Sequence, residues 1–175
     1  TWHEHTAQTS PYQINSEFLS RVEQVVDWAL AEDLYVILNA HHEAWLKEDF
    51  QSQKNQNRFD SIWIQIAEHF KEKPAKLMFE ILNEPNGMTV ANVNQINQDV
   101  LTIIRNQNPN RLVVFSGHGF TPISALLTID IPDVQDEFLI GNFHSYDPWQ
   151  FAGQCQKNWG TNQDKLQLRE IYQQA

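Results

Sequence analysis

One glutamate in this sequence stands where a carboxyl group could act as a general acid. The run LMFEILNEP ends an apolar segment with Asn83 and Glu84, and Pro85 then closes it. A carboxyl group at the rim of an apolar core is partly desolvated, which tunes its proton affinity toward what a general acid needs. The amide of Asn83 could hold a substrate hydroxyl beside it. The alternative interpretation is an ordinary surface turn that contains a glutamate.

Polar and aromatic clusters also follow the other apolar runs of the chain. They are Trp2–His5, His41–Trp45, Ser116–Phe120 and His144–Trp149. The carboxyl ends of parallel strands lie on one face of a sheet, so we expect these clusters to converge with Glu84 on one site. His144 and Tyr146 are two residues apart on a strand, so both side chains should face that site.

The histidines also raise the question of a metal site. Neighbouring residues of a regular strand point to opposite faces, so His41 and His42 should not bind one ion together. The sequence offers no HExxH helix and no thiolate partner for them. We therefore expect neither a metal nor a cofactor.

The tryptophans divide by position in the sequence. Trp28 and Trp63 lie in helical apolar stripes and are expected in the core. The other four lie in strand-end loops, where flat apolar rings suit the faces of pyranose sugars; they are Trp2, Trp45, Trp149 and Trp159. Tryptophans in loops serve equally as packing lids, and for Trp45 and Trp149 both interpretations stay open.

The elements that position these residues follow an alternating pattern. Short continuous apolar runs predict buried parallel strands over residues 35–40, 77–82, 112–116 and 138–143. Helical spacing predicts helices over 18–30, 59–70, 93–104, 123–127 and 164–174, with N-caps at Asn15 or Ser16 and at Thr89. This alternation is typical of parallel α/β architecture. A closed barrel of eight such units takes roughly 250 residues, so this chain holds about four to five.

Composition excludes several classes of function. The chain has 175 residues, a net charge of −10, one cysteine (Cys155) and no apolar run long enough for a membrane span. Nucleic acid and anionic membranes are therefore not expected as partners, whereas neutral sugars are not repelled. The sequence opens in mid-pattern, without an initiator methionine, so the lack of a signal peptide is uninformative.

Taken together, the strand-end motifs resemble glycoside hydrolase family 5, the cellulase and mannanase family of clan A. VILNAHHEAW is similar to the third barrel strand of that family, FEILNEPNG to the fourth, NFHSYDPWQF to the sixth and TWHEH to the end of the second. The resemblance covers nearly the whole chain. It implies that residues 1–175 form part of one catalytic domain, an incomplete parallel (β/α)8 TIM barrel running from the end of strand 2 to helix 6.

The resemblance also implies roles for individual residues. Glu84 would be the general acid/base and Asn83 the ligand of the sugar 2-hydroxyl. His144 would sit near Glu84, Tyr146 would orient the nucleophile, and His41 would support catalysis. The residues expected to bind substrate are His42, Trp45, Trp149, Trp2 and His5.

Two further elements of the family pattern are expected outside these residues. They are the arginine of strand 2, just upstream of Thr1, and the nucleophilic glutamate of strand 7, downstream of Ala175. Glu137 precedes an apolar strand and Glu170 lies on a helix, so neither takes the nucleophile's place. A retaining glycosidase needs an acid/base and a nucleophile roughly 5–5.5 Å apart, and this chain would own half of that pair.

The expected function is a retaining endo-glycosidase that cleaves β-1,4-glucan of the cellulose type, with glucomannan as a further substrate. Two alternatives stay open: a non-catalytic carbohydrate-binding remnant, and a clan A mannanase or xylanase. Family resemblance implies a secreted or extracellular protein. Made alone, the 175 residues are expected to be inactive and to self-associate through their open sheet edges.

Overall fold

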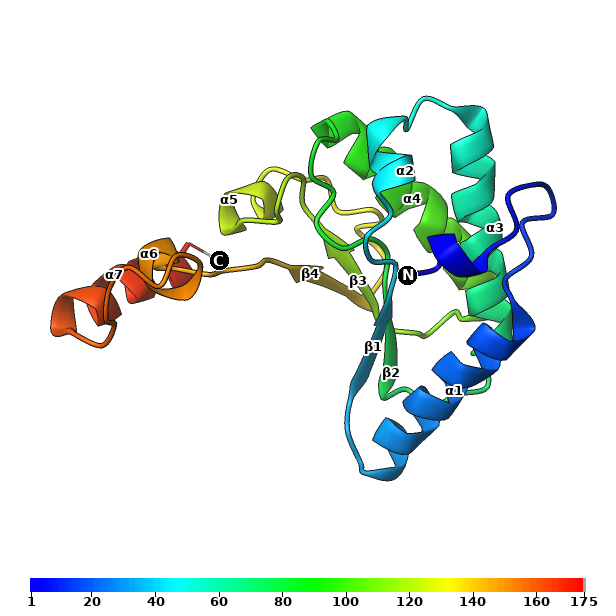
Figure 1. The fold of residues 1–175 in the computed structure, drawn as a ribbon, viewed down its shortest axis with the longest axis horizontal. Helices are drawn as coiled ribbons and strands as arrows, with labels where there is room; N and C mark the ends of the chain where they lie inside the picture. The colour runs from blue at the N-terminus through cyan, green and yellow to red at the C-terminus, as the bar shows by residue number, and fades with distance from the viewer. Residues whose placement is uncertain (175) are drawn as a thin grey trace.

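The computed structural model describes residues 1–174, which form a single parallel sheet of four strands (Figure 1). The strands are β1 (Val36–Asn39), β2 (Leu77–Glu80), β3 (Val113–Ser116) and β4 (Leu139–Asn142). Each strand pairs in parallel with the next one along the chain, in the order β1-β2-β3-β4. All four runs predicted to be strands are therefore strands, each shorter than predicted by one or two residues.

Helices connect the strands as the alternating pattern predicts. The long helices are α1 (Ser16–Ala31) before β1, α3 (Gln53–His69) before β2 and α4 (Val90–Gln107) before β3; the short helix α5 (Ile123–Leu126) precedes β4 and α7 (Asn162–Tyr172) follows it. The predicted caps are confirmed, because Asn15 accepts a hydrogen bond from the Phe18 amide and Thr89 accepts one from the Asn92 amide. The sequence did not predict η1 (His3–His5), α2 (Ala44–Glu48) or α6 (Trp149–Ala152).

The hydrophobic core lies between the sheet and the long helices. Trp63 of α3 packs its ring against Phe79 of β2 at a centroid distance of 5.8 Å, and both side chains are fully buried. Ile104 of α4 and Leu77 of β2 are equally buried in the same cluster. Trp63 is thus a core residue, as predicted.

Trp28 does not belong to this core, and the prediction that it would was wrong. Its side chain is 54% exposed on α1, with the Arg21 guanidinium 4.8 Å from the ring centroid. Apolar spacing along a helix identifies a stripe, but the stripe is buried only where a neighbouring element covers it.

The two outer strands of the sheet carry exposed apolar residues. β1 and β4 each pair with one neighbour among residues 1–174, and Ile37 of β1 and Ile140 of β4 are both exposed. Unpaired strand edges with apolar side chains favour pairing with another chain.

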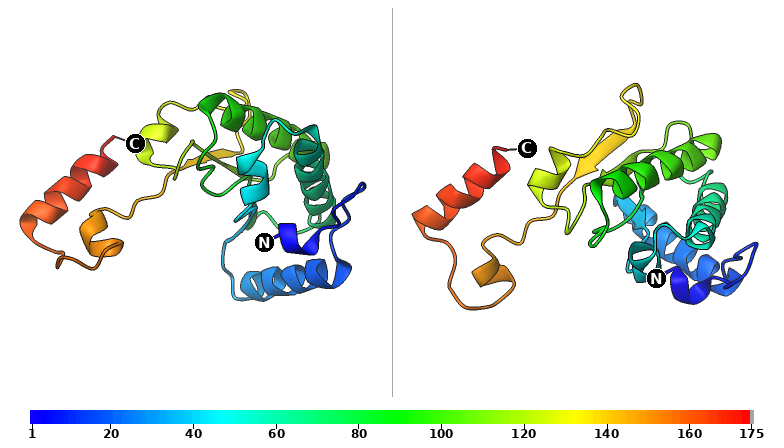
Figure 2. Two further views of the ribbon diagram at one scale, coloured as in Figure 1. Left: turned by 45° about the horizontal axis from the view of Figure 1, so that its top comes forward. Right: turned by 90° about the horizontal axis from the view of Figure 1, so that it is seen from above.

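The segment after β4 leaves the body formed by α1–α4 and the sheet. Figures 1 and 2 show α6 and α7 extending away from that body as an arm. From residue 141 to 174 the only buried side chain is that of Asp164. We call residues 145–174 the C-terminal arm. No helix among the described residues is long and apolar enough to cross a membrane.

Candidate active site

Glu84 lies in the loop that follows β2, next to a histidine that follows β4. Its Oε1 atom is 2.7 Å from Nδ1 of His144, and both side chains are about one quarter exposed. The backbone of Glu84 has a φ of +41°, in the left-handed region that a non-glycine residue enters at an expense of about 1–3 kcal/mol. Such strain persists where surrounding contacts determine the conformation, and it clusters at functional sites.

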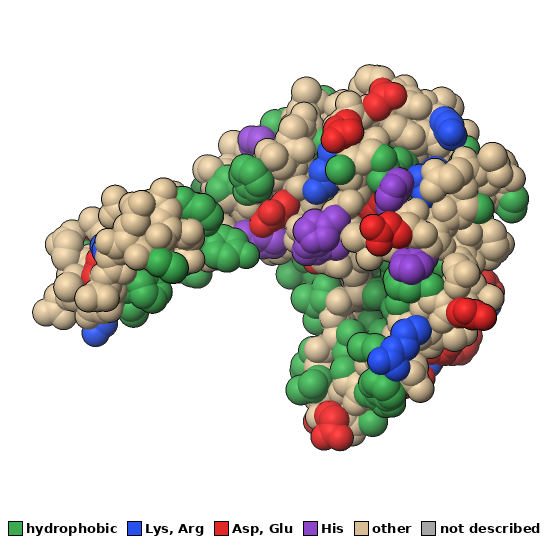
Figure 3. Space-filling view, viewed as in Figure 1, with side chains coloured by type: hydrophobic (Ala, Val, Ile, Leu, Met, Phe, Trp, Pro, Cys, Tyr) green, Lys and Arg blue, Asp and Glu red, His purple; other side chains and the backbone are tan. Residues whose placement is uncertain are grey.

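A cavity of about 710 Å³ opens beside Glu84. The residues that line it come from the loops after β2, β3 and β4 and from the arm; they are Glu84, Phe120, Pro122, His144, Tyr146, Asp147, Trp149, Ala152 and Gly153. The structure thus brings together four of the predicted site residues, Glu84, His144, Tyr146 and Trp149. The Tyr146 and Trp149 rings meet edge to face at 6.2 Å. Figure 3 shows histidine and acidic side chains gathered on this face of the molecule.

Asn83 lies next to a second set of polar side chains, which come from the ends of β1, β2 and β4 and from His41. Its Nδ2 atom is 3.5 Å from Nε2 of His41, and Nδ2 of Asn39 is 3.3 Å from Nδ1 of the same ring. Asn39 also donates to the Glu80 carboxylate at 2.9 Å, and Asn142 donates to its other oxygen at 2.8 Å. A neutral imidazole has one acceptor nitrogen, so His41 accepts a hydrogen bond from either Asn39 or Asn83 but not from both.

The sequence analysis missed this network, although a signal for it was present. β1, β2 and β4 each end with a polar residue after apolar ones, namely Asn39, Glu80 and Asn142. Strand register places Asn39 directly opposite Glu80. Asn142 lies on β4, beyond β3, yet its side chain also reaches the Glu80 carboxylate. A buried carboxylate requires hydrogen-bond partners, and these two amides supply them.

His41 and His42 lie closer together than the alternation of strand side chains predicts. Their ring centroids are 4.1 Å apart at an interplanar angle of 76°. The prediction of opposite faces was wrong because β1 ends at Asn39 and His42 takes a φ of +55°. Burial, and after it the neighbouring His42, lowers the pKa of His41, which favours the neutral ring. Within residues 1–174, no three His, Cys, Asp or Glu side chains form a group that could hold a metal ion.

Two of the predicted sugar-contacting aromatic residues make contacts within the protein: Trp2 is buried and Trp45 is partly buried. Trp2 is 4% exposed and donates its indole N–H to the Asn39 carbonyl at 2.9 Å, so it cannot offer its face to a sugar and that prediction is corrected. Trp45 donates to Glu43 at 2.5 Å, and the Arg58 guanidinium lies 4.6 Å from its ring centroid. These contacts favour the packing interpretation for Trp45.

The remaining predicted substrate contacts also lie outside the cavity beside Glu84. His5 stacks on Phe18 of α1 with centroids 3.8 Å apart, and His42 lies against His41. Phe120, which the sequence analysis did not single out as a contact, lines the cavity instead and is 64% exposed. Its position after β3 is the same strand-end signal that identified Glu84 after β2.

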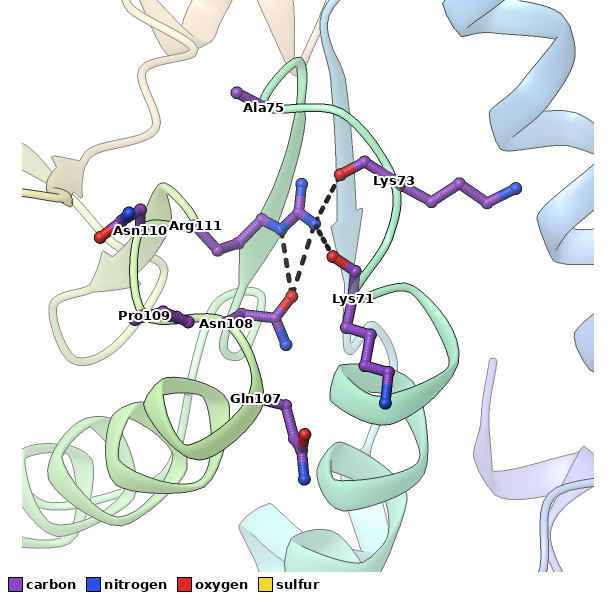
Figure 4. Close-up of a pocket in the computed structure, with 8 residues that line it drawn as sticks. All are labelled: Lys71, Lys73, Ala75, Gln107, Asn108, Pro109, Asn110 and Arg111. Atoms are coloured by element: carbon purple, nitrogen blue, oxygen red, sulfur yellow. Dashed lines mark hydrogen bonds between the residues drawn. The ribbon is translucent and has the colours of Figure 1, made fainter.

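A second cavity, of about 240 Å³, lies between the segments that enter β2 and β3 (Figure 4). Arg111 is its most conspicuous charged residue. The guanidinium donates to five backbone carbonyls, those of Phe70, Lys71, Lys73, Pro74 and Leu77. The Arg111 guanidinium thus ties together the segments around this cavity, and its donors are used inside the protein.

Comparisons with known proteins agree with this arrangement. The model of the family described as cellulase (glycosyl hydrolase family 5) matches residues 1–175. Endoglucanase H of Acetivibrio thermocellus is 46% identical over 164 residues, which are 93% of this chain and 18% of that protein. The chain therefore spans less than one fifth of the length of that relative.

Solved structures with the same fold are similar over almost the whole chain. A tri-modular endo-β-1,4-glucanase of family 5, subfamily 4, from Bacillus licheniformis superposes with a TM-score of 0.91 at 33% identity, covering 99% of this chain and 35% of that one. Endoglucanase Cel5A from Thermotoga maritima superposes with a TM-score of 0.91 at 29% identity, covering 98% and 59%. The prediction of an incomplete (β/α)8 barrel is confirmed, since the four parallel strands match part of these larger domains. With its whole length matched by one family model and its fold shared with solved members, the chain belongs to glycosyl hydrolase family 5, the cellulases.

Proposed function

We propose that the protein containing this chain is a retaining endo-β-1,4-glucanase in which Glu84 is the general acid/base. The observation that carries the proposal is the 2.7 Å hydrogen bond between Glu84 and His144 at the wall of an aromatic-lined cavity. A carboxyl group that must give a proton and then take one back needs a partner that holds its orientation in both states. The nucleophilic glutamate of the pair lies outside these 175 residues.

The neighbours of Glu84 take supporting roles in this proposal. Asn83, next in the chain and beside His41, binds the sugar 2-hydroxyl. Tyr146 lies in the cavity with Glu84 and orients the nucleophile. Trp149, 56% exposed in the same cavity, offers a flat ring to the face of a glucose unit.

The substrate is β-1,4-linked glucan, with glucomannan as a second polymer. The Bacillus licheniformis endo-β-1,4-glucanase was solved with cellotetraose, and Thermotoga maritima Cel5A with mannotriose, and both superpose on this chain. The net charge of −10 does not oppose a neutral polysaccharide. Because cell-wall polymers are too large to enter a cell intact, we propose that the enzyme works outside it.

Residues 1–175 form part of one catalytic domain in this proposal. Made alone, they self-associate through the open edges of β1 and β4, where Ile37 and Ile140 are exposed. Light scattering of the purified 175-residue chain measures this directly, and a stable monomer would contradict it.

The test of function uses the product of the complete coding sequence. We expect it to shorten carboxymethyl-cellulose internally, with a rapid fall in viscosity, and to cut glucomannan more slowly. Nuclear magnetic resonance of the first product should show a retained β-anomer. Faster cleavage of xylan or pure mannan would favour the other clan A activities. Binding of cellotetraose without any hydrolysis would favour a carbohydrate-binding protein.

A further inference from the structure

Lys47 makes two hydrogen bonds to the dipeptide that carries the acid/base. Its Nζ atom donates to the backbone carbonyl of Asn83 at 2.9 Å and to that of Glu84 at 2.7 Å. Lys47 belongs to the short helix α2, which follows β1, so it reaches Glu84 across the neighbouring strand end. One ammonium group thus bridges two successive carbonyl oxygens of the site.

The backbone that Lys47 holds has little regular structure of its own. Strand pairing of β2 with β1 ends at Glu80. Beyond it, the Asn83 amide donates to the Ala40 carbonyl at 2.9 Å, and Glu84 has a φ of +41°. The next bond along the chain is a tight one, from the Asn86 amide to the Glu84 carbonyl at 2.6 Å. A residue held in this sparsely populated region keeps its conformation only when neighbouring groups determine it, and Lys47 is such a group.

The surroundings of Lys47 fit a fixed cation and not a mobile surface lysine. Its side chain is partly buried, and burial lowers the pKa of the amine, whereas the Glu84 and Glu43 carboxylates oppose that change. Its helix is anchored by Leu46, which is fully buried, and by Trp45, which packs against the core. The position of Nζ is therefore set by the fold.

We propose that Lys47 is a positioning residue for catalysis, which holds the Asn83–Glu84 backbone so that the Glu84 carboxyl stays beside His144 and points into the cavity. The inference rests on the proposed function, because it assigns Lys47 to proton donation by Glu84. Lys47 itself does not touch the substrate. Its removal should impair the step that needs a proton from Glu84 and spare a step that does not.

Two substrates with different leaving groups test whether Lys47 positions Glu84 for proton donation. In the product of the complete coding sequence, Lys47→Met should lower kcat on cellotetraose about 100-fold, within the range for loss of general acid catalysis. On 2,4-dinitrophenyl cellobioside, whose leaving group departs without protonation, the rate of the first step should fall less than about threefold. KM should change little on cellotetraose and should fall on the dinitrophenyl glycoside, because the second step, in which Glu84 accepts a proton, becomes slow relative to the first. Lys47→Arg should restore most of the rate. Lys54→Met, at an exposed lysine of α3, is the matched control and should leave both rates unchanged.

Each outcome decides a different claim. An equal loss on both substrates would mean that Lys47 serves only the general stability of the fold and would overturn the inference. If Lys47→Met does not fold, Lys47→Gln removes the charge but keeps an NH₂ donor group. An equal loss on both substrates for that variant would overturn the inference as well. A parent protein that cleaves neither substrate would overturn the proposed function and this inference with it.

Discussion

The two walls of the cavity beside Glu84 differ in how they are held. The body wall carries Glu84 and Phe120, and it rests on strands and helices whose side chains are buried, such as Trp63 and Phe79. The arm wall carries Tyr146, which is 61% exposed, and Trp149, which is 56% exposed. Both walls face one cavity, and the body wall is supported by a packed core, whereas the arm extends away from the body (Figure 1).

Under the proposed function, this difference suits the two regions to separate tasks. Proton transfer by Glu84 would need groups fixed to within a fraction of an ångström, and in the body Lys47, His41 and the Glu80 network make the contacts that could fix them. Contact with a sugar face tolerates more movement, because apolar contact is not directional. The arm is instead ordered locally, by the capping box in which Thr161 and Asp164 bond to each other's backbone at the start of α7.

The largest effect expected concerns Glu84, the proposed acid/base of the body wall. Glu84→Gln, measured in the product of the complete coding sequence, should lower turnover of cellotetraose by about 10²–10⁴-fold, because the amide cannot donate an acidic proton. Binding of cellotetraose should persist. The control Glu137→Gln, at an exposed glutamate before β4, should keep full activity. Parent-like turnover by Glu84→Gln would exclude Glu84 as the acid/base.

The second prediction is that substitutions in the body and in the arm should change the free energy of unfolding by clearly different amounts. Trp63→Ala removes a fully buried ring from the body and should lower the free energy of unfolding by about 3–5 kcal/mol. Trp159→Ala removes a ring of the arm that is 38% exposed and packs on Phe151, and it should lower that free energy by less than about 1 kcal/mol. Urea titrations of both variants and the parent measure the two changes. Similar losses would show that the arm and the body share one core.

A third prediction compares two exposed tryptophans. Trp149→Ala should raise the dissociation constant for cellotetraose about tenfold, since loss of one ring contact is of order 1.4 kcal/mol. Trp28→Ala is the matched control, because Trp28 is 54% exposed but lies on α1, where it contacts Arg21 and not the cavity. Calorimetric titration gives both constants. Equal effects of the two changes would remove Trp149 from the binding wall.

These comparisons also show which parts of the molecule the sequence could predict. Strands and long helices were predictable, because runs such as 112–115 are continuously apolar and α4 has both a periodic stripe and a Thr89 cap. Of the short helices, α2 buries one side chain and α6 none, too few to produce a period, whereas α5 buries Ile123 and Ala125 and was predicted.

The site was predictable only where a side chain carries the signal. Glu84 and His144 follow apolar strands and could be found, whereas Lys47 bonds to backbone carbonyls, which any sequence provides. The mutual approach of His41 and His42 depends on where β1 stops, at Asn39, and on a positive φ that neither residue type requires. Long-range contacts of this kind follow from the folded backbone.

The smallest effect expected is a dependence of stability on pH. It should have opposite signs for a carboxylate of the body, Asp60, and one of the arm, Asp164. Asp60 of α3 faces the space between α3 and α4, where burial and the nearby Asp99 carboxylate raise its pKa to about 6. In the arm, hydrogen bonds from Lys157 and Thr161 lower the pKa of Asp164 well below its ordinary value. The folded state therefore prefers the protonated form of Asp60 and the ionised form of Asp164.

Opposite trends in stability follow from these two shifts. The contribution of Asp60 is fully present below its unfolded pKa of 3.8 and is lost as the pH rises through about 6. Asp60→Asn mimics the protonated form, so it should raise the free energy of unfolding by about 1 kcal/mol at pH 7, a value reduced for the solvent screening of a partly exposed group, and change it little at pH 4.

Asp164 contributes above an unfolded pKa of 3.8 and loses that contribution as the pH falls, so Asp164→Asn should destabilise α7 at pH 7 and less so at lower pH. Urea unfolding at pH 4 and pH 7 measures the first change, and hydrogen exchange of the α7 amides measures the second. Every other group titrates equally in parent and variant. An Asp60→Asn effect of the same size at both pH values would therefore show that the folded state does not raise the pKa of Asp60.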